Sequence, residues 1–213
     1  VGSLARYTLI ALVIVAALDQ FGIETTGFVA LLGAAGLAIG LAFQGTLSSL
    51  AAGVMILFFR PFTKGQFIEA GGVVGTVDEV NLFVTELHTP DNVQIIVPNS
   101  QLWGTAIKNY SHHETRRVDF VLGIGYGDDI GKAKDAVMAL ISADERTLSD
   151  PEPMVVVSNL GESSVDLTVR VWVKAEDYWN VKFDLTQGMK EEMDAKDINI
   201  PYPHRTLHVI NND

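Results

Sequence analysis

The chain of 213 residues is long enough for one sizeable folded domain with a small membrane part, or for two small domains. It contains no cysteine, which excludes a disulfide framework and a thiolate metal site. Its formal net charge is −11, from 26 acidic and 15 basic residues, and this acidic balance argues against nucleic acid as a partner.

The apolar residues are concentrated near the start of the chain, in two segments. Residues 7–18 are uncharged, follow Arg6 and end before Asp19. They are short for a full membrane span, which needs about 20 residues; because the chain begins at Val1 and not at Met, further sequence upstream is expected. Residues 27–59 contain no Asp, Glu, Lys, Arg or His. Two apolar segments in series, the second this long, do not fit a signal peptide.

These segments predict a membrane hairpin, with a transmembrane helix and loop over residues 1–26 and a second, kinked helix over residues 27–60. Basic residues flank its outer ends and acidic residues fill its loop, so the positive-inside bias places both ends on the cytoplasmic side. A straight helix over residues 27–59 would be about 50 Å long, against roughly 30 Å of hydrocarbon. We therefore expect a spanning half to about Phe43, a kink at Gln44 and Gly45, and an interfacial half to Phe59.

Apolar residues in the predicted interfacial half recur at steps of three and four, which is typical of an amphipathic helix. They are Leu47, Leu50, Ala51, Val54, Leu57 and Phe58.

The spanning half is rich in small residues, which let helices approach closely in lipid. Glycines and alanines fall on different faces of the helix, so the alanines of one copy can seat against the glycines of an identical neighbour and close a ring. Leu37 and Leu41 share a third face, which in such a ring forms two leucine collars that dewet and block ions. The two sets of small residues are Gly33, Gly36 and Gly40, and Ala30, Ala34 and Ala38.

The same pattern also fits a pair of packed anchor helices, because Gly36 and Gly40 have the GxxxG spacing. The residues alone leave both the pore and the non-conducting anchor open. A carrier would be expected to have inverted repeats and polar residues at mid-membrane, and neither is visible.

The rest of the chain reads as two soluble domains. Residues 61–107 alternate apolar and polar residues between turn formers, which predicts a small, strongly curved β domain with strands at residues 66–70, 73–77, 83–88 and 93–97. Residues 108–200 predict an α+β domain of ferredoxin-like order. Its expected elements are strand 117–124, helix 130–143, strands 154–159 and 164–173, and helix 179–195.

Candidate catalytic and ligand sites are weak. Gly123, Gly125 and Gly127 lack the dinucleotide-binding spacing and precede two aspartates, which favours a strand end and a helix N-cap. The adjacent His112 and His113 have no third metal ligand at a recognisable spacing and fit a surface linker. Trp172 and Trp179 are expected to pack in the α+β core. No metal site, cofactor site or enzyme activity is predicted.

Residues 27–62, GFVALLGAAGLAIGLAFQGTLSSLAAGVMILFFRPF, resemble the pore helix of the small-conductance mechanosensitive channel family, the MscS-like channels. The resemblance continues to the end of the chain through shorter motifs. These are GGVVGTV at residues 71–77, IIVPNS at 95–100, RVWV at 170–173 and PYP at 201–203.

The resemblance implies a fold and a set of site residues. Leu37 and Leu41 match the leucine rings that close the pore, Gly45 matches its kink, and Gly53 matches a second glycine where kinking is proposed. The small residues named above match the packing between pore helices. The β domain is identified as Sm-like, and residues 201–213, with a strand at 206–210, match the strand of an oligomeric β-barrel.

The resemblance also implies a function: a homoheptamer without a cofactor in the bacterial inner membrane, opened by tension on hypoosmotic shock. Its partners are identical subunits, membrane lipids, and permeating ions and small solutes. Three departures bear on gating threshold and inactivation: Phe43 for a smaller aliphatic residue, Ser49 for an asparagine, and Asp19-Gln20 for a Gly-Arg pair.

Overall fold

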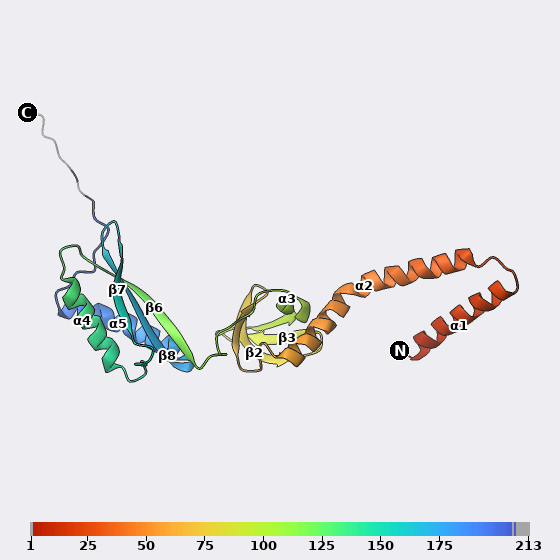
Figure 1. The fold of residues 1–213 in the computed structure, drawn as a ribbon, viewed down its shortest axis with the longest axis horizontal. Coiled ribbons are helices and arrows are strands. Elements are labelled where there is room, and N and C mark those ends of the chain that lie inside the picture. Colours follow the sequence, from red (N-terminus) through yellow and green to blue (C-terminus); the bar gives the residue numbers. More distant parts are fainter. Residues whose placement is uncertain (1, 206, 208–213) are drawn as a thin grey trace, which may run out of the picture. The chain divides into compact units, whose positions relative to one another are not determined.

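The structure, a computed structural model, describes residues 2–205 and 207 (Figure 1). The chain divides into two compact units, the first ending at Asn109 and the second beginning at Tyr110. The first unit holds two N-terminal helices and a β domain, and the second is an α+β domain. These match the fold class predicted from the sequence.

The two apolar segments form helices joined by a short loop. Helix α1 covers Gly2–Gln20 and helix α2 covers Thr26–Phe59. In the loop, the hydroxyl of Thr25 donates to the Asp19 carboxylate at 3.2 Å, and Thr25 is buried. Among the described residues, α2 is the helix that is long and apolar enough to cross a membrane, by length and composition.

Helix α2 is continuous over its 34 residues. It ends at Arg60, whose backbone is left-handed with φ 50° and whose N–H donates to the Ile56 carbonyl at 2.8 Å. Figure 1 shows that the axis of α2 changes direction part-way along. The assignment of a kink to Gln44 and Gly45 stays a prediction.

The β domain is a single antiparallel sheet in the order β4-β3-β2-β1-β5. A tight turn joins its first two strands: β1 and β2 pair at Ala70 and Val73, which leaves Gly71 and Gly72 as a two-residue turn with φ 59° and 81°. Positive φ at both positions is what such a hairpin turn requires. The strands are β1 (Phe67–Ala70), β2 (Val73–Val80), β3 (Val84–His88), β4 (Gln94–Pro98) and β5 (Lys108–Asn109), and a short helix α3 (Asn99–Trp103) follows β4.

The core of the β domain takes in the end of α2. Ile56 of α2 is 1% exposed and packs with the buried Phe62, Ile68 and Leu102. The four strands predicted in this domain are confirmed, with no end displaced by more than three residues, whereas α3 and β5 were not predicted.

The α+β unit is a three-stranded antiparallel sheet, β6-β8-β7, packed on two helices. Alternate residues of β8 from Val165 to Val173 are buried, because one face of the sheet lies against α4 and α5. The elements are β6 (Thr115–Ile124), α4 (Ile130–Ala143), β7 (Met154–Leu160), β8 (Val165–Lys174), the 3₁₀ turn η1 (Ala175–Asp177) and α5 (Tyr178–Ala195).

The prediction that Trp172 and Trp179 pack in the core is wrong. Trp172 alternates with the buried Val171 and Val173, so it lies half-buried on the opposite sheet face. Trp179 is 52% exposed and stacks on Phe183, one helical turn further along. The predicted strand at 206–210 lies outside the described residues, apart from residue 207.

Candidate functional site

The predicted spanning half of α2 has an uncovered surface in a single copy of the chain. Leu37 and Leu41 are 66% and 62% exposed. A Cβ added at Gly36 or Gly40 would meet nothing within 4 Å, and the same holds at Gly33 and Gly45. The other predicted site residues of this half are exposed as well: Ala30, Ala34, Ala38 and Gln44. So much apolar surface requires cover from lipid or from further copies of the chain.

The helix places these residues in a definite angular order. With about 100° of rotation per residue, Gly33, Gly36 and Gly40 project to one side and Ala30, Ala34 and Ala38 to another. The mean direction of Leu37 and Leu41 lies between those of the glycines and the alanines. Neighbours that pack glycine side to alanine side would therefore turn their leucines toward a common centre.

Some of these residues also face α1. A groove of about 590 Å³ between the two helices is lined by Tyr7, Leu12, Leu32 and Gly33, among others. Ala30 lines a second groove of about 620 Å³ closer to the loop. Helix α1 therefore does not pack tightly against α2 near Gly33 and Ala30.

The half of α2 that follows Gly45, here called its lower half, is docked on the β domain. Its buried residues are Ser49, Ala52, Gly53 and Ile56, which share one face at helical spacing. The hydroxyls of Ser49 and Ser100 lie 3.0 Å apart and form a hydrogen bond between α2 and α3. Gly53 is thus the one predicted site residue of α2 that is buried in the described chain.

Gly53 lies at a very close approach to the β2–β3 loop. A Cβ there would be 2.1 Å from the Leu82 carbonyl oxygen and 2.5 Å from the Asn99 side-chain nitrogen. Asn99 is fully buried; its side chain accepts from the Thr85 hydroxyl and donates to the Asn81 carbonyl, both at 2.8 Å. This satisfied network holds the loop against which α2 packs.

Sequence reasoning missed this docking face because it followed the large apolar residues. The face is made of Ser49, Ala52 and Gly53, which are small or polar, and only Ile56 is a large apolar residue. The signal that was present is the spacing of small residues at i, i+3 and i+4, which permits close backbone approach.

The glycine-rich motif is the end of strand β6 followed by the N-cap of α4, as predicted. The Asp128 carboxylate accepts from the Gly125 N–H at 2.9 Å and from the Asn199 N–H at 3.0 Å. Asp129 caps α4 by accepting from the Lys132 N–H at 3.0 Å. The carboxylates of Asp128 and Asp129 therefore already accept hydrogen bonds from backbone N–H groups that a bound phosphate would need.

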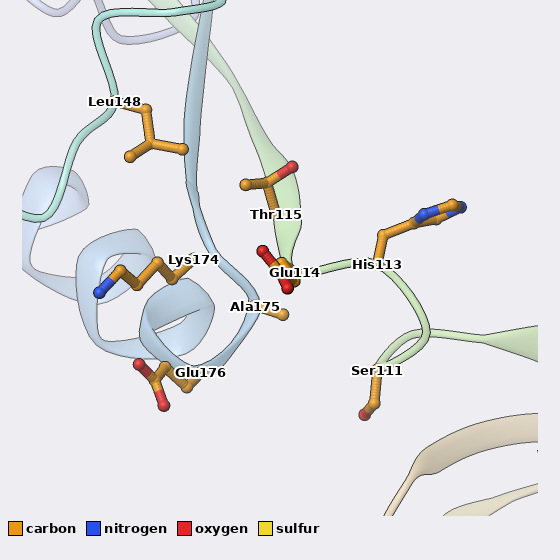
Figure 2. Close-up of a pocket in the computed structure, with 8 residues that line it drawn as sticks. All are labelled: Ser111, His113, Glu114, Thr115, Leu148, Lys174, Ala175 and Glu176. Carbon is orange, nitrogen blue, oxygen red and sulfur yellow. The ribbon is translucent and has the colours of Figure 1, made fainter.

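A pocket of about 570 Å³ in the α+β unit does not assemble a reaction centre (Figure 2). Figure 2 shows His113 pointing away from Lys174 and Glu176. The Glu114 carbonyl is bonded to the Ala175 N–H at 2.8 Å, which joins the two segments that line the pocket. Over the described range, no group of three His, Asp or Glu side chains could hold a metal ion.

Comparison with known proteins accounts for nearly the whole chain. Three family models match in series: mechanosensitive ion channel transmembrane helices 2/3 at residues 3–44, the mechanosensitive ion channel beta-domain at 45–112, and the MscS C-terminal domain at 118–200. A small-conductance mechanosensitive channel of Edwardsiella ictaluri is 42% identical over 97% of this chain and 72% of its own length. The chain belongs to the MscS-like family of mechanosensitive channels.

Other MscS-family proteins agree. An MscS family protein of Synechocystis is 38% identical over 98% of this chain and 71% of its own length. The crystal structure of Helicobacter pylori MscS in the closed state has a TM-score of 0.89 and 32% identity, over 99% of this chain and 85% of that one. Structures of Arabidopsis thaliana MSL1 share the fold at 21% identity and a TM-score of 0.78.

Membership in this family confirms the resemblance read from the sequence. The chain is a membrane protein of a channel family and not an enzyme.

Proposed function

We propose that the chain is one subunit of a homoheptameric, weakly selective channel in the bacterial inner membrane, opened by membrane tension on hypoosmotic shock. The subunit crosses the membrane more than once, and residues 61–213 lie in the cytoplasm. Residues 201–213 supply one strand of an oligomeric barrel. The observation that carries the proposal is the exposed pair Leu37 and Leu41, which projects between a glycine side and an alanine side of α2.

The mechanism follows from this angular order. In the closed ring, Leu37 and Leu41 form two collars narrow enough to exclude water, and a dry constriction does not pass ions. Tension favours the conformation with the larger in-plane area, as a ligand favours the state it binds better. When the α2 helices tilt and the alanines slide along the glycine grooves, the collars move apart, wet, and admit ions and small solutes.

The kink proposed at Gln44 and Gly45 separates the spanning half of α2 from the half docked on the β domain. Glycine has no side chain to restrict its backbone, so a helix bends more easily there. A bend at Gly45 would let the spanning half of α2 change its tilt while the docked half stays in place. The family resemblance implies a second kink at Gly53, but the close approach of Gly53 to the Leu82 carbonyl favours a docking role for this residue.

Patch-clamp recording of the purified protein in liposomes tests the proposal. Suction should evoke stepwise currents that vanish when the suction is released. A protein that forms oligomers but passes no current at any tension below membrane rupture would instead be a scaffold, and the proposal would fall.

A further inference from the structure

The lower half of α2 is turned the opposite way from an ordinary amphipathic helix. Apart from Ile56, it buries small or polar residues against the β domain, and it leaves most of its large apolar residues exposed. Leu47, Val54 and Phe58 are 66%, 51% and 77% exposed. In a soluble protein such residues face the core, so this outward face is built for an apolar surrounding.

The exposed apolar face continues from α2 onto the β domain through stacked aromatic rings. Phe58 and Phe59 meet edge to face at 5.0 Å, and Phe59 stacks on Trp103 of α3 with ring centroids 6.0 Å apart. Phe59 is 59% exposed and Trp103 is 37% exposed. We call Phe58, Phe59 and Trp103 the aromatic surface. Two exposed cations, Arg60 and Lys64, follow it in the chain.

We propose that the aromatic surface lies in the interfacial layer of the bilayer, so that the β domain itself contacts lipid through Trp103. This inference rests on the proposed function, since it needs α2 in a membrane. The partner is a lipid surface whose acyl chains meet the rings and whose phosphates pair with Arg60 and Lys64.

Three observations favour lipid as the occupant. Phe58 and Phe59 lie at the end of α2, the described helix that is long and apolar enough to cross a membrane. Tryptophan beside phenylalanine suits the boundary between apolar and polar layers, since the indole N–H can stay hydrated. Arg60 directly follows Phe59, and both Arg60 and the exposed Lys64 carry a charge that complements phosphate in an otherwise acidic chain.

The chain allows a direct test because it has three tryptophans, Trp103, Trp172 and Trp179. The full chain with Trp172→Phe and Trp179→Phe retains Trp103 alone and is reconstituted in phosphatidylcholine–phosphatidylglycerol liposomes with brominated or unbrominated acyl chains. Bromine quenches tryptophan on contact. We expect lower Trp103 emission in the brominated lipid, with the larger loss when bromine is near the headgroup end of the acyl chain.

The matched control carries Trp103→Phe and Trp172→Phe and retains Trp179, which stacks on Phe183 in the α+β unit. Its emission should be equal in both lipids. If the double variants fold poorly, the difference in quenching between the natural chain and the single Trp103→Phe variant gives the same answer.

Equal Trp103 emission in brominated and unbrominated lipid overturns the inference; in that case another subunit covers the aromatic surface. Suction responses of the same liposomes separate this inference from the proposed function. Currents without quenching leave the channel standing and remove the lipid contact. Quenching without currents keeps the lipid contact and removes the channel.

Discussion

Gly53 sits where α2 approaches the β2–β3 loop most closely, and its missing side chain is what allows the contact. The nearest atom to an added Cβ is the Leu82 carbonyl oxygen at 2.1 Å, which belongs to the backbone and cannot swing aside. Gly53→Ala should therefore push α2 off the β domain. We expect it to destabilise the protein by about 1–3 kcal/mol, the usual cost of overpacking, seen as a lower thermal midpoint of the purified oligomer.

Gly127→Ala is the matched control, because a Cβ there meets nothing within 4 Å. It should leave the midpoint nearly unchanged. An equal drop in thermal midpoint in the Gly53→Ala and Gly127→Ala variants would show that the contact at Gly53 does not hold the helix against the β domain.

Asp144 and Arg146 form a second residue-scale feature, at the end of α4. The Arg146 guanidinium donates twice to the Asp144 carboxylate, at 2.9 and 2.7 Å, and once to Asp184 on α5 at 2.7 Å. The side-chain hydrogen bonds from Arg146 to Asp144 hold the pKa of Asp144 below its ordinary value of 3.8. Because the folded-state pKa is depressed, the stabilisation is present above that ordinary value and is lost as the pH falls through the folded-state pKa.

Asp144→Asn should therefore lower the thermal midpoint at pH 7, and the difference from the natural chain should shrink as the pH falls below about 4. Asp135→Asn, at an exposed position of α4, serves as the control and should change little at either pH. A deficit in Asp144→Asn that stays constant from pH 7 into acid would contradict the assignment.

At the scale of the element, the two faces of the spanning half of α2 can be told apart by substitution. Leu37→Ser or Leu41→Ser makes the proposed collar easier to wet, so the tension that opens the channel should fall. Ile39 is 60% exposed, close to the two leucines, and projects to the opposite side of the helix. Thresholds come from patch-clamp recording with a co-reconstituted channel of known threshold.

Ile39→Ser is the control and should not reproduce the lowered threshold. An unchanged or raised threshold in both leucine variants, or an equal drop in Ile39→Ser, would remove Leu37 and Leu41 from the pore.

The elements differ in how far the sequence predicts them. Helix α4 has the predicted bounds because Asp129 supplies an N-cap and apolar residues recur at helical spacing behind it. Helix α3 has five residues, too few to show a period, and its Asn99 is buried by contacts distant in the chain. The docked face of α2 is small and polar, and only the folded β domain reveals what it packs against.

At the scale of the whole molecule, the acidic chain bears on which ions pass. A net charge of −11 per subunit, all of it beyond Arg60, makes the surroundings of the proposed pore negative. A negative surrounding raises the local concentration of cations. We expect a modest cation preference, measured as the reversal potential in a KCl gradient, that weakens as salt is raised because the charges are screened. A clear anion preference would contradict it.

The order of the parts along the chain is readable from sequence, because each has its own period and composition. The assembly is less accessible, since the exposed leucines and small residues of α2 fit either a ring or an anchor pair. Family membership places the protein among the mechanosensitive channels, while Leu37, Leu41 and the packing residues remain proposed assignments that the recordings would test.

The hydrogen bond between Ser49 and Ser100 and the buried run down to Ile56 have a mechanical consequence. From Ser49 onward we expect the helix and the β domain to move together, because Pro61 restricts the backbone that follows the left-handed Arg60. Tilting of the spanning half of α2 should then either bend the helix before Ser49 or shift the β domain with it.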